Sequence, residues 1–135
     1  MYKLSANSRK RLVGVDQVLI QIIESAITDS PYDFGIPSDG GLRTEDRQRQ
    51  LYAQGRTKPG NIITQVDGVK NKSIHQYGKA FDIYAFVNGR ATWEPKYYEP
   101  IARHIQKVAL EKFGVKLDWG GDWKKFKDMP HLQMA

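Results

Sequence analysis

The spacing of apolar residues along the chain predicts three helices. In residues 16–28 apolar side chains recur at the spacing of one helical face, and Asp16 stands where the first turn needs a cap. Residues 45–54 lie between a threonine that can cap a helix and a glycine that can end one. A third pattern covers residues 94–113, with a proline inside it that breaks or starts the helix, and Gly114 is placed to end it.

Shorter runs of alternating or β-branched residues predict strands between and after these helices. They cover residues 32–36, 83–87 and 115–119. An Asn-Gly pair after the second run predicts a tight hairpin turn, and the residues after Pro130 predict a short terminal strand. Helices mixed irregularly with short strands predict an α+β fold around a small, mainly antiparallel sheet.

Length and composition narrow the class of protein. A chain of 135 residues is expected to form one domain over residues 1–135. No apolar run approaches the ~20 residues of a membrane span, and the N-terminus lacks the features of a secretory signal, so no stable membrane insertion is expected. The chain has no cysteine, so any zinc site must use histidine and carboxylate ligands.

The net charge of +6 favours an anionic partner such as a bacterial envelope, although solubility alone explains it equally well. The basic residues are scattered among acidic ones, and no ladder of aromatic and basic residues indicates base stacking. We therefore expect no nucleic-acid partner. A chain this small is expected to act as a monomer.

Candidate chemistry concentrates between Ser73 and Asp82, in the stretch Ser-Ile-His-Gln-Tyr-Gly-Lys-Ala-Phe-Asp. His75 lies in the approach to the strand predicted at residues 83–87. Asp82 is expected at the start of that strand, with little positional freedom. Of the two other histidines, His104 falls beside the apolar stripe of a predicted helix, which is typical of a helix-flank residue.

His131 lies on the predicted terminal strand, three residues after Asp128. With His75 and Asp82 it gives two imidazoles and one carboxylate, a set that suits zinc and leaves a fourth position for water. A carboxylate outside the set, such as Asp128, can then serve as a general base. On residue type alone, a metal site and a chance grouping of these side chains remain equally open.

At these residues the sequence resembles the zinc peptidases of the D-Ala-D-Ala carboxypeptidase/dipeptidase superfamily. Within it, the L-alanyl-D-glutamate endopeptidases of phage endolysins and bacterial wall hydrolases are the most similar group. The family pattern S-x-H-x-x-G-x-A-x-D is matched without a gap at residues 73–82, and D-x-x-H at residues 128–131. Gly-Leu-Arg-Thr at residues 41–44 and Trp-Gly-Gly-Asp-Trp at residues 119–123 resemble two further family segments.

The resemblance implies a Hedgehog/DD-peptidase-like α+β fold and zinc as cofactor, bound by His75, Asp82 and His131. It implies that Asp128 is the general base, with Asp118 and Asp122 as rivals. It places Arg43 opposite the metal, as a catalytic group or a substrate anchor, and Ser73 among the substrate-binding residues.

Three features remain open. Gln133 is two residues past His131 on the same strand face and can orient that ligand. Trp119 and Trp123 can form a substrate platform or belong to the core. The polar, turn-rich loop at residues 56–72 either borders the substrate cleft or is a simple insertion.

The function expected from this resemblance is zinc-dependent hydrolysis of the peptidoglycan stem peptide at the L-Ala-D-Glu bond, in cell lysis or wall degradation. A D-Ala-D-Ala carboxypeptidase or dipeptidase would keep the same ligands, and a non-catalytic zinc module that binds the wall would have no need of Asp128. We expect a phage or prophage product, made in the cytoplasm, that acts on the wall after release.

Overall fold

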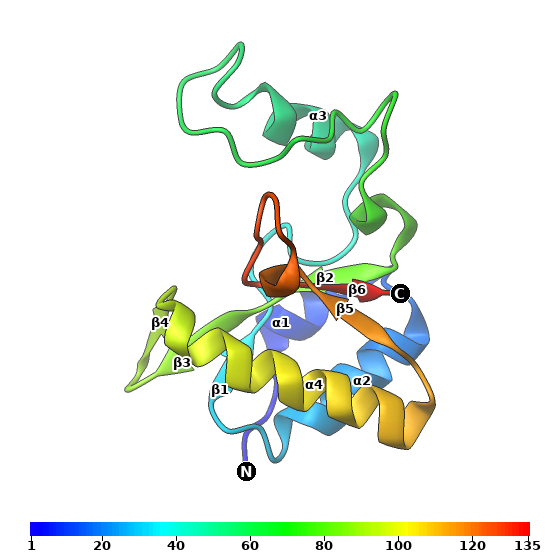
Figure 1. The fold of residues 1–135 in the computed structure, drawn as a ribbon, viewed down its shortest axis with the longest axis vertical. Helices are drawn as coiled ribbons and strands as arrows, with labels where there is room; N and C mark the ends of the chain where they lie inside the picture. Colours follow the sequence, from blue (N-terminus) through cyan, green and yellow to red (C-terminus); the bar gives the residue numbers. More distant parts are fainter.

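The computed structural model describes residues 1–135 (Figure 1). Its α-helices are α1 (Ala6–Arg11), α2 (Gln17–Ile27), α3 (Glu45–Ala53) and α4 (Tyr98–Phe113). Its strands are β1 (Asp33–Gly35), β2 (Ala80–Asp82), β3 (Tyr84–Val87), β4 (Arg90–Thr92), β5 (Leu117–Trp119) and β6 (His131–Met134). The 3₁₀ turns are η1 (Ile74–Tyr77), η2 (Pro95–Tyr97) and η3 (Gly120–Asp122). The expected α+β class is confirmed.

The strands form two small antiparallel sheets where the sequence predicted one. One sheet has the order β1-β3-β4, and the other has the order β2-β6-β5. The expected hairpin joins β3 to β4, with Asn88 and Gly89 at positive φ as a type I′ turn requires. Because β2 and β3 follow each other directly, this part of the chain runs from one sheet into the other.

The predicted strand at residues 83–87 is wrong at its N-terminal end. Asp82 is the last residue of β2 and does not begin the next strand. The break falls at Ile83, whose N–H donates to the carbonyl of Pro130, and β3 then pairs with β1. An apolar run cannot reveal such a change of partner, because Ile83 is fully buried and reads like a strand residue.

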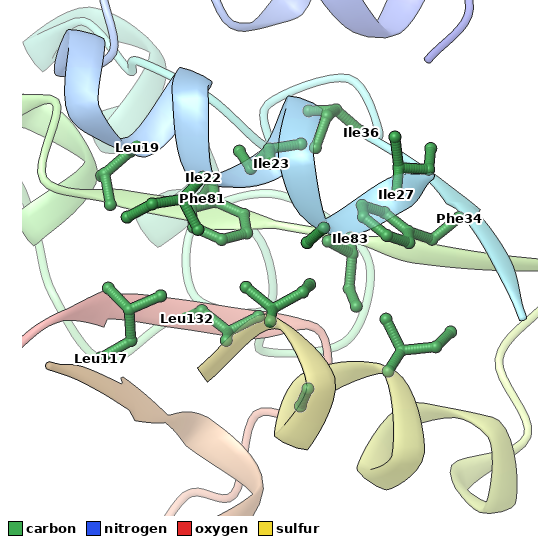
Figure 2. Close-up of a cluster of buried hydrophobic side chains, with 14 of the residues drawn as sticks. Leu19, Ile22, Ile23, Ile27, Phe34, Ile36, Phe81, Ile83, Leu117 and Leu132 are labelled. Atoms are coloured by element: carbon green, nitrogen blue, oxygen red, sulfur yellow. The ribbon is translucent and has the colours of Figure 1, made fainter. Parts of the chain in front are cut away.

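Helices α2 and α4 pack against each other and turn their apolar stripes into the core, as the sequence predicts. Asp16 caps α2 by accepting from the N–H of Val18 at 3.0 Å, and Gly114 ends α4 with a φ of 65°. Figure 2 shows side chains of α2 facing those of β2, β5 and β6 across the interior. The core residues labelled there include Leu19, Ile22, Phe81, Leu117 and Leu132. This packing gives β2 and β6 a rigid base.

Helix α3 and the loop that follows it lie away from this core, at the top of Figure 1. Thr44 caps α3 by accepting from the N–H of Arg47, as expected. Only Gln48 and Leu51 of this helix are buried. None of the helices combines the length and the apolar character that crossing a bilayer requires.

Candidate active site

Strand pairing brings two distant side chains to one point. Asp82 on β2 lies directly opposite His131 on β6. The N–H of Asp82 donates to Gly40 and that of His131 donates to Asp128, so this pair exchanges no backbone hydrogen bond. Side chains are closest at such non-hydrogen-bonded positions of an antiparallel ladder. The register of β2 against β6 therefore sets the carboxylate against the imidazole.

His75 reaches the same point from the turn η1. Ser73 caps this turn, and its Oγ accepts from the N–H of His75 at 3.2 Å. Gln76 completes a capping box by accepting from the N–H of Ser73. Gly78 then ends the turn with a φ of 70°, and the space beside its Cα is closed by the carbonyl of Gly14. The motif spacing thus encodes a short capped turn that directs His75 inward.

Three atoms from these side chains form a nearly equilateral triangle. His75 Nε2 lies 3.1 Å from His131 Nδ1 and 3.2 Å from Asp82 Oδ1. The third side, from His131 Nδ1 to Asp82 Oδ1, is 3.1 Å. Both imidazoles are buried, and the carboxylate is 14% exposed. The predicted ligand set is therefore assembled in the fold, and it forms a group that could hold a metal ion.

Hydrogen bonds on the outer side of each ring fix which nitrogen faces inward. His75 Nδ1 lies 2.9 Å from the carbonyl oxygen of Gly41, which can only accept, so Nδ1 carries the proton. His131 Nε2 likewise donates to Gln133 Oε1 at 2.8 Å. The two inner nitrogens of the neutral rings consequently present lone pairs to one another and to a carboxylate oxygen.

Three converging acceptors need a cation at their centre. A tetrahedral zinc ion with Zn–N and Zn–O bonds of about 2.0–2.1 Å spaces its ligand atoms roughly 3.3–3.4 Å apart, close to the sides of this triangle. The donor set is two imidazoles and one carboxylate, each held from behind by a further hydrogen bond, as metal ligands usually are. The residues present therefore fit zinc.

The pKa values of Asp82 and His131 reflect their burial and their close contact. When a proton rather than a cation occupies the triangle, burial opposes ionisation of Asp82, but hydrogen bonds from the protonated His131 and His75 outweigh burial and hold the pKa of this carboxyl far below its usual range. Burial lowers the pKa of His131, but the hydrogen bond to Asp82 and the charge of Asp82 raise it by more. The net pKa of His131 is therefore raised. The carboxylate thus stays ionised and attracts positive charge to the triangle.

Asp128 is the free carboxylate beside this triangle. Its Oδ2 lies 4.0 Å from His131 Nδ1, and 46% of its side chain is exposed to the cleft. Partial burial, followed by the negative charge of Asp82, raises the pKa of Asp128. No hydrogen bond occupies its carboxylate, which is available to take a proton.

The segment Trp-Gly-Gly-Asp-Trp at residues 119–123 positions Asp128. The carbonyl of Gly120 accepts from the N–H of Asp128 at 3.1 Å. A Cβ on Gly120 would lie 2.2 Å from the carbonyl oxygen of Asp128, so only glycine permits this approach. Of the two tryptophans, Trp119 is buried in the core and donates to Met129, whereas Trp123 lines the cleft 5.2 Å from the His131 ring.

Neither rival acid has this position. Asp122 binds Arg103 through both carboxylate oxygens, at 2.6 and 2.7 Å, and does not line the cleft. Asp118 lies on β5 opposite Gln133 and does not line the cleft either. His104 bonds the carbonyl of Ala26 at the end of α2, far from the triangle in the fold, as expected of a helix-flank residue.

Arg43 lies at the edge of the site and is already engaged. Its Nη2 donates to Asp82 Oδ2 at 3.2 Å, its Nη1 to Gln48 and its Nε to the carbonyl of Asp39. These bonds use three of the five N–H groups of a guanidinium and leave two without a protein partner. The N–H of Arg43 also donates to the carbonyl of His75. Arg43 thus holds the outer oxygen of Asp82 while it faces the cleft.

The cleft has a volume of about 780 Å³ and lies between two loops. Residues 62–66 and 72–75 form one wall, and residues 123 and 125–128 form the other. The loop at residues 56–72 therefore borders the cleft. Ser73, the predicted substrate-binding residue, is part of the first wall.

The sequence did not predict that Gln48 belongs to the site. It is fully buried although it lies on the polar helix α3. Its Oε1 accepts from Arg43, and its Nε2 donates to Thr64 and to the carbonyl of Val66. Gln48 thus ties the arginine of the site to the cleft-bordering loop. Five positions separate it from Arg43, and no local pattern marks it.

Comparison with known proteins identifies the family. Residues 1–133 match the family of phage L-alanyl-D-glutamate peptidases. The chain belongs to this family. It is similar to the L-alanyl-D-glutamate peptidase of Escherichia phage T5, with 30% identity over 127 residues, which cover 94% of this chain and 85% of that protein.

Two further relatives support the assignment. The peptidoglycan L-alanyl-D-glutamate endopeptidase CwlK of Bacillus subtilis (strain 168) is 40% identical over 98 residues. That match covers 70% of this chain and 57% of CwlK, so the chain spans little more than half of that relative. The crystal structure of the L-Ala D-Glu endopeptidase ChiX of Serratia marcescens superposes with a TM-score of 0.78 at 31% identity, covering 99% of this chain and 90% of that one.

Proposed function

We propose that this peptidase is a zinc-dependent endopeptidase that hydrolyses the L-Ala-D-Glu bond of the peptidoglycan stem peptide. The observation that carries the proposal is the triangle of three acceptor atoms beside a free carboxylate in an open cleft. Family membership supports the choice of bond, because the relatives above are named for it.

His75, Asp82 and His131 would hold the ion. When bound, zinc supplies a Lewis acid and lowers the pKa of a bound water toward ~7. Asp128 accepts the proton of the attacking water and returns it to the nitrogen of the leaving D-Glu. Its raised pKa suits this exchange, because a stronger base takes the first proton more readily.

Arg43 lines the cleft and has two N–H groups left over, which would donate to the carbonyl oxygen as negative charge develops. Gln48 and the carbonyl of Asp39 hold the guanidinium in place, so little reorganisation accompanies this contact. Ser73 keeps its hydroxyl proton, since its Oγ only accepts from His75, and can donate to the substrate backbone.

We further propose that the protein is a phage or prophage product, made in the cytoplasm, that reaches the wall after release. The phage members of its family support this proposal. The net charge of +6 would favour binding to an anionic envelope.

Mass spectrometry of fragments released from purified peptidoglycan tests the function. The proposal predicts peptides with a new N-terminal D-Glu, from wild type and not from a His75→Ala variant. Release of free D-Ala would instead identify a carboxypeptidase or dipeptidase. Wall binding without any new fragment would identify a non-catalytic module.

A further inference from the structure

Three lysines of the cleft have no role in the chemistry proposed above. Lys72, Lys125 and Lys127 line the cleft, and none of them takes part in an ion pair. Three acids line the cleft: Asp39 binds Arg47, Asp82 belongs to the triangle, and Asp128 forms no ion pair with a lysine. The lining thus carries four cationic side chains against three carboxylates, an excess of positive charge.

Two of these lysines stand beside the reacting centre. Lys72 directly precedes Ser73, and Lys127 directly precedes Asp128. Since consecutive Cα atoms are ~3.8 Å apart, each lysine is anchored within one residue of a side chain of the site. The two residues lie on opposite walls of the cleft. An anion bound near the triangle therefore lies in a cleft whose lining carries one lysine next to Ser73 and another next to Asp128.

The chemistry of the substrate supplies such an anion. A glutamate that follows the cleaved bond carries two carboxyl groups, and only one of them can continue the peptide. In the peptidoglycan stem the chain continues through the γ-carboxyl, so the α-carboxyl remains on the carbon that bears the scissile nitrogen. A carbonyl held at the triangle places this α-carboxylate only a few bonds away. Arg43 already shares its guanidinium with Asp82 and is assigned above to the carbonyl oxygen, so this carboxylate needs a different cation.

We propose that Lys72 and Lys127 form a carboxylate subsite that recognises the free α-carboxylate of D-Glu. The proposal rests on the proposed function and adds a specificity to it. The enzyme cleaves stem peptides with a free α-carboxylate in preference to those in which this group is an amide. An amide is neutral and offers an N–H₂ donor where the lysines require an acceptor.

The test compares two synthetic stem tripeptides that begin with L-Ala-γ-D-Glu, one with a free α-carboxylate and one with an α-carboxamide. Their kcat/KM values are measured with zinc-loaded wild type and with Lys72→Gln and Lys127→Gln. The matched controls are Lys70→Gln and Lys124→Gln, which change exposed lysines of the same two loops that do not line the cleft.

We expect wild type to prefer the carboxylate peptide. Each cleft variant should lose on the order of ten-fold in kcat/KM on that peptide, the usual loss for one charge-assisted hydrogen bond, and little on the amide. The two control variants should retain the wild-type preference. Equal cleavage of both peptides by wild type, or equal losses on both in the cleft variants, would overturn the subsite.

Two further measurements distinguish this subsite from recognition of another carboxylate and from failure of the proposed function. A third tripeptide, amidated only at the carboxyl of its last residue, distinguishes the α-carboxylate from a carboxylate farther along the stem. If amidation there abolishes the lysine dependence, the assignment to D-Glu is wrong. If no peptide is cut at the L-Ala-D-Glu bond by any form of the enzyme, the proposed function itself fails.

Discussion

The contact between Gly120 and Asp128 gives the sharpest test of how the fold positions the proposed general base. In Gly120→Ala the new Cβ would lie 2.2 Å from the carbonyl oxygen of Asp128 and 3.0 Å from its Cβ. Ordinary contacts begin at 3.4 Å, so the backbone of Asp128 must recede by about 1.2 Å. The backbone of Gly120 has no positive φ, so the effect comes from this contact alone.

A displacement of this size at a reacting group is expected to lower kcat/KM by roughly 10²-fold. Overpacking should lower stability by ~1–3 kcal/mol, which leaves the protein folded. The displaced carbonyl also accepts from the N–H of His131, but zinc content should stay near the wild-type level, because the pairing of β2 with β6 still holds Asp82 against His131 and His75 lies on η1. The assay is cleavage of a stem peptide, with metal analysis and a melting curve on the same preparation.

Two variants control the experiment. Gly89→Ala makes the same change at the hairpin tip, where a Cβ meets nothing within 4 Å, although the φ of 79° strains the alanine. It should lose some stability and keep its activity. Asp128→Asn keeps the shape of the side chain, and it should lose ~10²–10⁴-fold in turnover with zinc retained. A Gly120→Ala enzyme with wild-type kcat/KM would refute the positioning argument.

Three further predictions concern other contacts. Arg43→Lys should lower turnover with zinc content near wild type, because an ammonium cannot hold Asp82 and face the cleft together; unchanged kcat and KM would remove it from the mechanism. Gln133→Leu should weaken zinc binding by ~10–100-fold, measured by competition with a chelator, because a ring N–H loses its acceptor; unchanged affinity would contradict this. A hydrogen bond from Lys79, aided by the N–H of Val18, holds the pKa of Asp16 below its usual value. The ionised Asp16 therefore stabilises the fold at pH values above its unfolded-state pKa, and this stabilisation is lost as the pH falls through its folded-state pKa. Asp16→Asn should therefore lower the melting temperature by a few degrees at pH 7 and leave it unchanged in strong acid. An equal drop in melting temperature at the two pH values would contradict this prediction.

The ligands could be predicted from the sequence because their motif is local. Ser73, His75 and Gly78 describe a capped turn and its left-handed end, and all of this is encoded within a few residues. The alternation after Pro130 also predicts the strand that carries His131. Their convergence with Asp82 required the resemblance, since spacing alone left the metal site and a chance grouping equally open.

Other parts of the site depend on contacts between distant segments. The chain changes sheets at Ile83, and its apolar run gives no sign of this. The engagement of Arg43 by Asp82, over 39 positions, and the burial of Gln48 follow only from the folded arrangement. The same holds for Gly120, whose need to be glycine comes from a carbonyl eight residues away.

The central claim is that one metal ion, held by His75, Asp82 and His131, sustains cleavage of the L-Ala-D-Glu bond. Its most direct test is a titration of zinc into metal-free enzyme, with cleavage of a stem peptide as the readout. The account predicts no cleavage without metal and a linear rise that ends at one equivalent of zinc per chain. Full cleavage by the metal-free enzyme, or no recovery after one equivalent, would contradict it.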